Sequence, residues 1–350
     1  MRSQIVIPDI PGVLSANELS VTADHLVALQ LPCGMIPWFP GGHCDPWNHV
    51  ESAMALDVAG RPGPARAAYE WLAATQDADG SWPNYVWSDG SVEEPKRDTN
   101  VCAYLATGLA HHWRRTGDAA FVEALWPAVT RALSFVLSHR RADGLVLWAV
   151  DADGTRPWDY ALLTGTCSIL HALRSGVELA GVVGDPRPEW TVAADVMDAA
   201  VAERPEAFEP KTRWAMDWYY PVLSGALTGE TAKARMAEGW DTFAMEGRGI
   251  RCVSDEPWIT ASETAECAIA YAAIGDVATA TDLLAWTRLH RRVDGAYWTG
   301  LVYDAARPVG VRFPFDEHTS YTAAAVLLAA DAIAGTGPAS RLFVPPPDPD

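Results

Sequence analysis

The segment 213–223 (RWAMDWYYPVL) surrounds one carboxylate, Asp217, with aromatic rings. The rings belong to Trp214, Trp218, Tyr219 and Tyr220. Aromatic side chains at this density are typical of a core, or of a site for a ligand with flat faces and polar edges, such as a sugar. Burial among rings favours the protonated form of an acid, so Asp217 is suited to general-acid catalysis. Pro221 predicts that a helix opens there, with Asp217 on the preceding loop, where it could also act as a cap.

Glycoside hydrolysis usually requires a second carboxyl group, and the segment 315–328 (FDEHTSYTAAAVLL) supplies one in Glu317. Thr319 or Ser320 can cap the helix that follows, which leaves Glu317 free to act as a base. Its polar neighbours favour an ionised carboxylate that can activate a water. If the two groups face each other, we expect their carboxyls to lie about 6.5–9.5 Å apart, the separation of an inverting pair.

Asp45 and Glu263 are the reserve catalytic candidates. Each also has a structural explanation, since Asp45 precedes Pro46 as a helix cap would, and Glu263 completes a capping box that starts at Thr260. We assign substrate binding to residues on predicted loops or helix starts. These are Trp47, His49, Asp98, Asp159, Trp214, Trp218, Tyr219, Tyr220, Trp258 and Trp298.

Two kinds of helical segment alternate along the chain. Segments that are apolar nearly all round, as in buried helices, begin near Asp45, Asp98, Asp159, Asp217, Glu263 and Asp316. Amphipathic segments cover about 15–30, 63–76, 119–139, 190–203, 229–245 and 276–289. This pattern predicts an all-α fold, an (α/α)6 toroid with no sheet of consequence, whose inner helices open their N-termini at one mouth. We expect one domain, 1–340, and a disordered Pro/Asp-rich tail, 341–350.

The net charge of −19, from 26 basic and 45 acidic residues, argues against nucleic acid or an anionic membrane as a partner. Sixteen Trp favour a carbohydrate substrate. The six Cys form no C-x-x-C pair, and we predict no metal and no cofactor. We see no signal peptide and no apolar run of membrane-spanning length, so a cytoplasmic location is expected. A homo-oligomer is left open.

The order of the segments resembles the (α/α)6 glycosidases, which include glucoamylases, trehalases and processing-glucosidase-like enzymes. The resemblance implies that Asp217 is the catalytic acid and Glu317 the base, because those positions match the family's loops. The phrases DPWNHVESAMALDVAG, DTNVCAYLATG, WAMDWYYPVLSG and YTAAAVLLAADA more closely resemble an actinobacterial family labelled prenyltransferase-like, with its hydrolases of mycobacterial methylmannose polysaccharides. That resemblance implies endo-cleavage of α-(1→4)-linked mannose chains. The first repeat departs from the glycosidase pattern, with a cluster of Asp45, His49 and Glu51.

Four other functions are compatible with a toroid. One is an α-glucosidase or trehalase-like enzyme. A prenyl or terpenoid enzyme is a second, but the chain lacks a D-x-D-D motif, and the contiguous His43, Cys44 and Asp45 make a poor tetrahedral zinc site. A sugar epimerase would need paired His at the mouth, whereas most candidates fall within helices; they are His49, His111, His112, His171 and His318. A non-catalytic carbohydrate-binding protein would tolerate the loss of either carboxylate.

Overall fold

The computed structural model describes residues 6–304 and 306–344. The chain divides into two compact units, which we describe separately. The first unit comprises 1–29, 54–62 and 211–350, and the second comprises 30–53 and 63–210. Helix α2 (Pro46–Val58) begins in the second unit and ends in the first. The predicted single domain, 1–340, stays a prediction.

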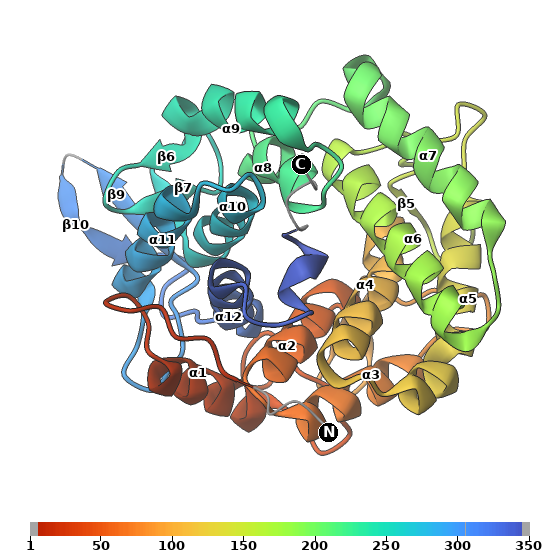
Figure 1. Ribbon diagram of the computed structural model, residues 1–350, viewed down its shortest axis with the longest axis horizontal. Coiled ribbons are helices and arrows are strands. Elements are labelled where there is room, and N and C mark those ends of the chain that lie inside the picture. Colours follow the sequence, from red (N-terminus) through yellow and green to blue (C-terminus); the bar gives the residue numbers. More distant parts are fainter. Residues whose placement is uncertain (1–5, 305, 345–350) are drawn as a thin grey trace. The chain divides into compact units, whose positions relative to one another are not determined.

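The first unit contains six further helices (Figure 1). They are α1 (Ala16–Leu29), α8 (Ala215–Leu223), α9 (Gly229–Phe243), α10 (Ala261–Ala273), α11 (Val277–Trp286) and α12 (Ser320–Ala334). Helix α10 packs against both α8 and α12, and is in turn covered by α11, while α9 packs on α8 and α1 on α12. Eleven of the thirteen residues of α10 are buried, but only four of the fifteen in α9 are. The alternation of buried and amphipathic helices is therefore confirmed in this unit.

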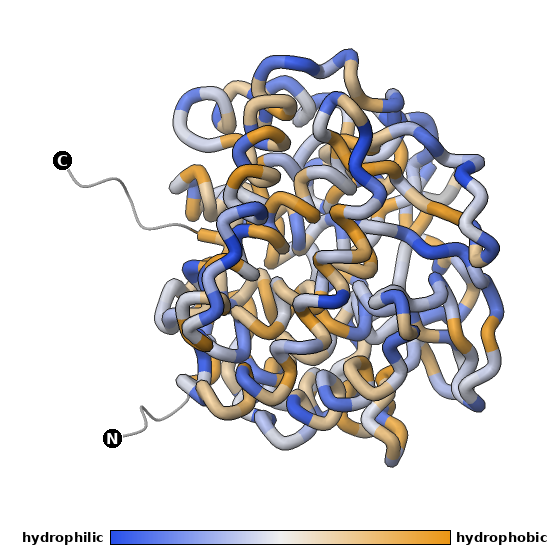
Figure 2. The backbone as a smooth tube through the Cα atoms, turned by 90° about the vertical axis from the view of Figure 1, so that its right-hand side faces the viewer, coloured by the Kyte–Doolittle hydropathy of each residue, from blue (hydrophilic) through white to orange (hydrophobic). Residues whose placement is uncertain are grey.

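The second unit repeats this arrangement with five helices besides the start of α2. They are α3 (Pro62–Ala74), α4 (Thr99–Thr116), α5 (Ala119–Ser138), α6 (Leu163–Val183) and α7 (Pro188–Glu203). The buried helices α4 and α6 pack against each other, while α5 covers both and α7 covers α6. Figure 2 shows hydrophobic and hydrophilic residues alternating along the backbone, as expected for helices that are partly buried and partly exposed. Gly176 permits the close approach of α6 to α7, because a Cβ there would lie 3.0 Å from the Trp190 ring.

Short strands occupy the linkers between helices. In the first unit β6 (Ala244–Met245), β7 (Gly249–Arg251), β8 (Trp258–Thr260), β9 (Gly300–Asp304) and β10 (Arg307–Arg312) form one antiparallel sheet in the order β10-β9-β8-β7-β6. The second unit has a sheet of β1 (His43–Cys44), β2 (Tyr85–Trp87) and β3 (Val92–Glu94), and a pair of β4 (Arg97–Asp98) and β5 (Ala149–Val150). The prediction of no sheet of consequence is wrong for the five-stranded sheet. Eight of the ten described strands have only two or three residues, too few to show a readable alternation in the sequence.

Helix α8 differs from its prediction. It begins at Ala215, so Asp217 lies in its first turn and Pro221 in its interior rather than at its start. Trp214, not an acidic residue, occupies the N-cap position. The placement of Asp217 on a loop is therefore wrong, and its side chain is fixed by helical backbone instead.

Helix α5 is, among the described residues, the one helix that is long and apolar enough to cross a membrane by length and composition. The prediction that no apolar run reaches this length is therefore wrong. Half of its apolar window is buried, and it packs against α4 and α6, as a core helix of a globular unit does.

The predicted disordered tail, 341–350, falls partly outside the described residues, which end at Val344. Within them, Ser340–Leu342 forms a 3₁₀ helix and Phe343 is buried. Ordered structure therefore extends past the predicted boundary at residue 340.

Candidate active site

Three carboxylates of the first unit lie at the N-terminal ends of buried helices. Asp217 and Glu263 are each the third residue of their helices, α8 and α10, and Glu317 stands two residues before Thr319, the N-cap of α12. A helix N-terminus stabilises negative charge, which suits an acidic residue at each position.

Backbone hydrogen bonds tie these three helix ends together. The amide of Ala215, at the start of α8, donates to the carbonyl of Cys252 (3.0 Å), and the thiol of Cys252 donates to Glu263 Oε1 (3.2 Å). Thr299 links the other two helices, because its carbonyl accepts from Ala261 at the start of α10 and its amide donates to the carbonyl of Glu317 (3.0 Å). The carboxylates of α8, α10 and α12 are thus held at one end of the first unit.

The Glu263 carboxylate accepts three hydrogen bonds. Its Oε2 accepts from the hydroxyls of Thr260 and Ser262, the latter at 2.7 Å, while Oε1 accepts from Cys252. The predicted capping box is only partly realised: Thr260 is the N-cap, but its hydroxyl binds the Glu263 carboxylate and no helix amide. Burial and the Glu263 carboxylate raise the pKa of Cys252, so the thiol stays protonated as a donor. Glu263 is therefore rigidly positioned.

Glu317 has different surroundings. It is half-buried, and within 6–304 and 306–344 its carboxylate makes no hydrogen bond or ion pair. Burial and the carboxylates of Glu263 and Glu317 raise the pKa of Tyr321, which places this tyrosine near both and keeps its hydroxyl protonated. An unoccupied, half-buried carboxylate beside a hydroxyl donor is suited to accept a proton from a water.

Asp217 is buried in the first turn of α8, with only 7% of its surface exposed. Arg235 of α9 donates from Nη2 to its backbone carbonyl at 2.7 Å. On the next helical turn Tyr219 donates to the carboxylate of Glu266, and burial with the Glu266 charge raises the pKa of this tyrosine.

The aromatic residues around Asp217 are mostly packed. Trp218 is 4% exposed, its ring stacks on Phe243 (5.5 Å between centroids), and its Nε1 donates to the Arg235 carbonyl (2.8 Å). Tyr219 and Tyr220 are also buried. Residues of α9 cover Trp218, and Tyr219 binds Glu266 of α10, so packing accounts for these two rings, and the assignment of all three residues to substrate binding stays a prediction. Trp214, with 44% of its surface exposed, is the ring that a ligand can reach.

Two more predicted binding residues lie by the five-stranded sheet. Trp298 is 9% exposed, and guanidinium groups lie over its ring, Arg312 at 3.8 Å and Arg292 at 4.4 Å. These cations occupy the place where a sugar would stack on the ring, so its assignment to substrate binding gains no support and stays a prediction. Trp258 is half-buried and donates from Nε1 to the Phe313 carbonyl (3.1 Å).

In the second unit Asp45 and Asp98 serve as helix caps. Asp45 Oδ1 accepts from the amide of Asn48 (3.0 Å), and Oδ2 from Trp38 Nε1 and Asn48 Nδ2 (2.7 Å each). Burial raises the pKa of Asp45, against these hydrogen bonds. Asp98 similarly caps α4 and accepts from Trp148 Nε1 at 2.6 Å. Because both carboxylates are already occupied, their best-supported role is structural.

Of the other predicted residues in the second unit, two are buried and one is exposed. His49 is buried, accepts from the amide of Ile36 at Nδ1 and contacts the Ala68 carbonyl through Nε2 (2.9 Å). Trp47 is 8% exposed and stacks on Tyr104 at 4.6 Å. Packing in the core accounts for both rings, and their assignment to substrate binding stays a prediction. Asp159 is exposed, four residues ahead of α6.

The capped Asp98 makes stability depend on pH. Burial raises its pKa from 3.8 to about 6, against the nearby Lys96 ammonium. The folded state therefore holds a proton that the unfolded state releases between those values, so stability falls as pH rises from about 4 to 6. Asn caps a helix as well as Asp, so Asp98→Asn should remove this loss of roughly 2–3 kcal/mol. Urea unfolding of both proteins at pH 4 and pH 7 checks this; identical pH dependence would contradict it.

Four rings form an aromatic face on the sheet of the second unit. It consists of Trp38, His43, Tyr85 and Trp87. The rings of His43 and Tyr85 stack at 4.6 Å, Trp38 meets His43 edge-on at 4.4 Å, and Trp87 is 39% exposed. The alternation in Tyr85-Val86-Trp87 is the local sequence signal for this face, because alternate residues of a strand point to the same side of a sheet.

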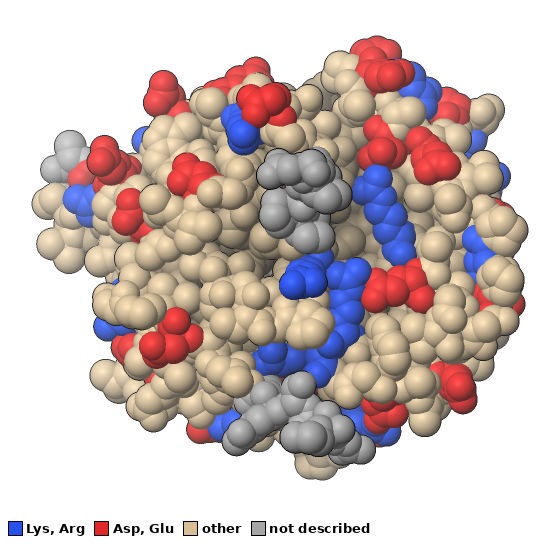
Figure 3. Space-filling model, viewed as in Figure 1, with Lys and Arg blue, Asp and Glu red and all other residues tan. Residues whose placement is uncertain are grey.

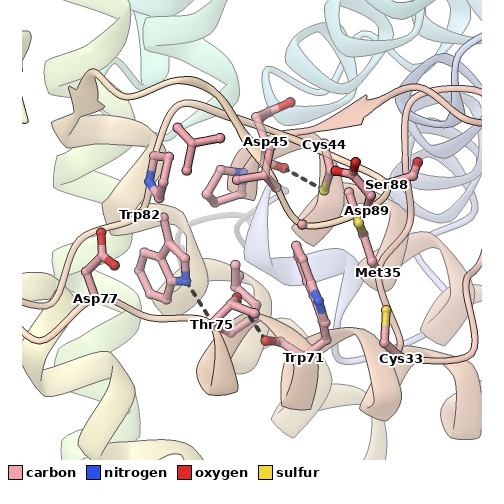
Figure 4. Close-up of a pocket in the computed structure, with 16 residues that line it drawn as sticks. Cys33, Met35, Cys44, Asp45, Trp71, Thr75, Asp77, Trp82, Ser88 and Asp89 are labelled. Atoms are coloured by element: carbon pink, nitrogen blue, oxygen red, sulfur yellow. Dashed lines mark hydrogen bonds between the residues drawn. The ribbon is translucent and has the colours of Figure 1, made fainter.

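The opposite face of the same sheet borders a cavity of about 350 Å³ (Figure 4). Cys44 and Val86, which alternate with the residues of the aromatic face, line it together with Trp71 of α3 and Trp82 of the loop that follows α3. The walls are largely apolar. Asp45 borders this cavity, with its carboxylate engaged by Trp38 and Asn48.

Acidic side chains are spread over the surface shown in Figure 3, with Lys and Arg among them. In the described part of the chain no three His, Cys, Asp or Glu side chains are grouped as metal ligands would be.

Comparisons with known proteins give the context of this geometry. No family profile matches the chain. Over 337 residues it is 48% identical to the MMP endo-(1,4)-3-O-methyl-α-D-mannosidase of Mycolicibacterium hassiacum, covering 96% of this chain and 92% of that protein. It is 28% identical over 135 residues to an uncharacterized glycosyl hydrolase of Methanocaldococcus jannaschii, covering 36% of this chain and 22% of that protein.

Solved structures of similar fold include a wild-type glycosidase, with a TM-score of 0.73 and 13% identity over 91% of this chain and 98% of that one. A D-mannose isomerase gives a TM-score of 0.68 and 12% identity over 94% and 100%. At such identities the likeness shows the fold alone. It confirms the predicted all-α class, an (α/α)6 toroid of the glycosidase type.

Proposed function

The chain belongs to the family of the MMP endo-(1,4)-3-O-methyl-α-D-mannosidase and is a glycoside hydrolase, and from this we propose that it cleaves α-(1→4)-linked mannose chains of the methylmannose polysaccharide type at internal bonds. The observation that carries the proposal is the 48% identity over 96% of the chain. The aromatic surfaces at Trp214 and on the sheet of the second unit support a carbohydrate ligand, because flat rings accept the apolar faces of sugars.

Within this function, we propose that Asp217 is the general acid and Glu317 the general base of an inverting hydrolysis. Asp217 is buried in the first turn of α8, and a helical backbone holds a proton donor in a fixed position relative to the substrate. Glu317 has no protein donor on its carboxylate within the described residues, which leaves it able to bind and activate a water. We assign Glu263, held by three donors, a positioning role between them.

The histidine arrangement gives no support to a sugar epimerase. His49, His111, His112 and His171 are buried, and His318 binds the Asp316 carbonyl through Nδ1. A toroid shared with D-mannose isomerase does not carry that activity to this chain, because function lies in the site and not in the fold.

The substrate is tested with a panel of α-linked oligosaccharides. We expect α-(1→4)-manno-oligosaccharides, with or without 3-O-methyl groups, to be cut internally, and α-gluco-oligosaccharides and trehalose to stay intact. Mass spectrometry of the products separates internal cutting, which gives several lengths at once, from stepwise release of single sugars. Release of glucose from the gluco series, with the manno series untouched, would overturn the proposal.

A further inference from the structure

The first unit carries a groove on its helical exterior, which we call the α9–α11 groove. It lies between α9, the end of α10 and the start of α11, and has a volume of about 790 Å³. Its principal lining residues are Lys233, Met236, Trp240, Asp241, Tyr271 and Asp276. Ligand sites of proteins typically measure about 300–1,000 Å³, so the groove can hold more than one sugar unit.

Trp240 provides a flat ring in this groove. It is half-buried, meets Tyr271 edge-on at 5.5 Å, and has Trp286 behind it at 6.4 Å. Tyr271 is itself fixed, because its hydroxyl donates to the Met236 carbonyl (3.4 Å). Throughout 6–304 and 306–344, no protein group accepts a hydrogen bond from the Trp240 indole. A rigid ring with an available N–H is suited to a ligand that has both apolar faces and hydroxyls.

Polar side chains of both charges surround this ring. Lys233 and Asp241 are exposed, and Asp276 caps α11, accepting from both the amide and the hydroxyl of Thr279. Lys233 is also paired with Glu230 at 2.7 Å. One cation among several carboxylates does not make an anion site, whereas mixed donors and acceptors around an aromatic ring fit a neutral polyhydroxy chain.

The groove is separate from the proposed active site. Glu263 lies in the first turn of α10 and Tyr271 near its last, eight residues later. At 1.5 Å per residue this is about 12 Å along the helix axis, and Asp276 lies beyond it. A ligand in the groove is therefore at the opposite end of α10 from the gathered carboxylates.

We propose that the α9–α11 groove is a second carbohydrate-binding site, which holds a distant part of the same mannose polymer while another part is cleaved. This rests on the proposed function. Attachment at a second point makes delivery of the chain to the active site intramolecular and raises its effective concentration. A long polymer gains from this, and an oligosaccharide too short to reach both sites does not.

The test compares Trp240→Ala with wild type on a long α-(1→4)-mannose polymer and on a tetrasaccharide of the same linkage. We expect KM for the polymer to rise roughly tenfold, which corresponds to about 1.4 kcal/mol, with kcat unchanged. The tetrasaccharide should give unchanged kinetics. The matched control is Trp286→Phe, which alters a neighbouring ring outside the groove and should behave as wild type. The double variant Lys233→Ala/Asp241→Ala changes only exposed side chains, so it tests the groove without endangering the fold.

An unchanged polymer KM in Trp240→Ala and in the double variant would overturn the second site, as would an equal rise of KM for the tetrasaccharide. If wild type cleaves neither substrate, the proposed function fails by itself. The groove is then judged by affinity electrophoresis in gels containing the polymer: slower migration of wild type than of Trp240→Ala supports it, and equal migration overturns it.

Discussion

Asp217→Asn and Glu317→Gln should each lower kcat by about 10²–10⁴-fold, the usual contribution of a general acid or base. Each substitution removes the proton-transferring group and keeps the shape of the side chain, so substrate should still bind. Asp217 lies on a rigid turn of α8, and Glu317 on the chain just before α12, so neither change should disturb packing. The measurements are steady-state kinetics, and calorimetric binding of an oligosaccharide by the inactive proteins.

Two matched substitutions show whether the pair is assigned correctly. Asp45→Asn preserves a helix cap and should leave kcat within a few-fold of wild type, while Glu263→Gln should reduce it less than Glu317→Gln does. Near-normal rates in Asp217→Asn and Glu317→Gln, with activity lost in the other two, would move the assignment to Asp45 and Glu263. Proton NMR of the first-formed product tests inversion, since retained anomeric configuration is incompatible with it.

Trp218→Ala should destabilise the fold by about 3–5 kcal/mol, the usual cost of removing a large buried ring. The ring fills the contact between α8 and α9, where a Cβ on Gly239 would approach it to 2.3 Å, and it stacks on Phe243. The exposed Trp214 makes the matched comparison: Trp214→Ala should change stability by less than about 0.5 kcal/mol and weaken oligosaccharide binding instead. Urea unfolding and ligand-induced quenching of tryptophan fluorescence measure the two effects.

Trp218→Phe separates packing from recognition, because it keeps most of the buried ring. Near-normal stability together with normal ligand affinity is expected. If Trp218→Phe were stable and yet no longer bound the oligosaccharide, Trp218 would be a binding residue after all, and the structural assignment would be wrong.

The helices could be predicted from the sequence because their signal is local. Helices α10 and α12 have small apolar residues on all sides, whereas α9 and α11 have one polar and one apolar side. This difference indicates which helices are buried, and it can be seen without knowing what packs against them. The positions of the acids followed, since a carboxylate before or within the first turn of a buried helix lies at that helix's N-terminal end.

The role of each aromatic residue could not be predicted in this way. Trp214 and Trp218 are neighbours of similar type, and what separates them is Gly239 and Phe243, which come from a helix some twenty residues later. Likewise, the ring of Trp298 is covered by Arg292 and Arg312, which come from two different segments. The residues that pack on a ring come from distant parts of the sequence and cannot be recognised from the residues next to it. The number of Trp residues therefore indicated the class of ligand, a carbohydrate, but not which Trp residues contact it.

Pro221 stands four residues after Asp217, at the position whose amide would normally bond the Asp217 carbonyl within the helix. Proline has no amide hydrogen, and Arg235 of α9 supplies the missing donor to that carbonyl from Nη2 at 2.7 Å, while its Nε donates to the carbonyl of Trp218 at 3.3 Å. The hydrogen bonding of the helical turn that carries Asp217, the proposed acid, is thus completed by a side chain of another helix. Pro221 and Arg235 are thereby coupled: loss of the Arg235 side chain from α9 would remove the donor from the turn that carries the proposed acid, although Arg235 itself belongs to a different helix.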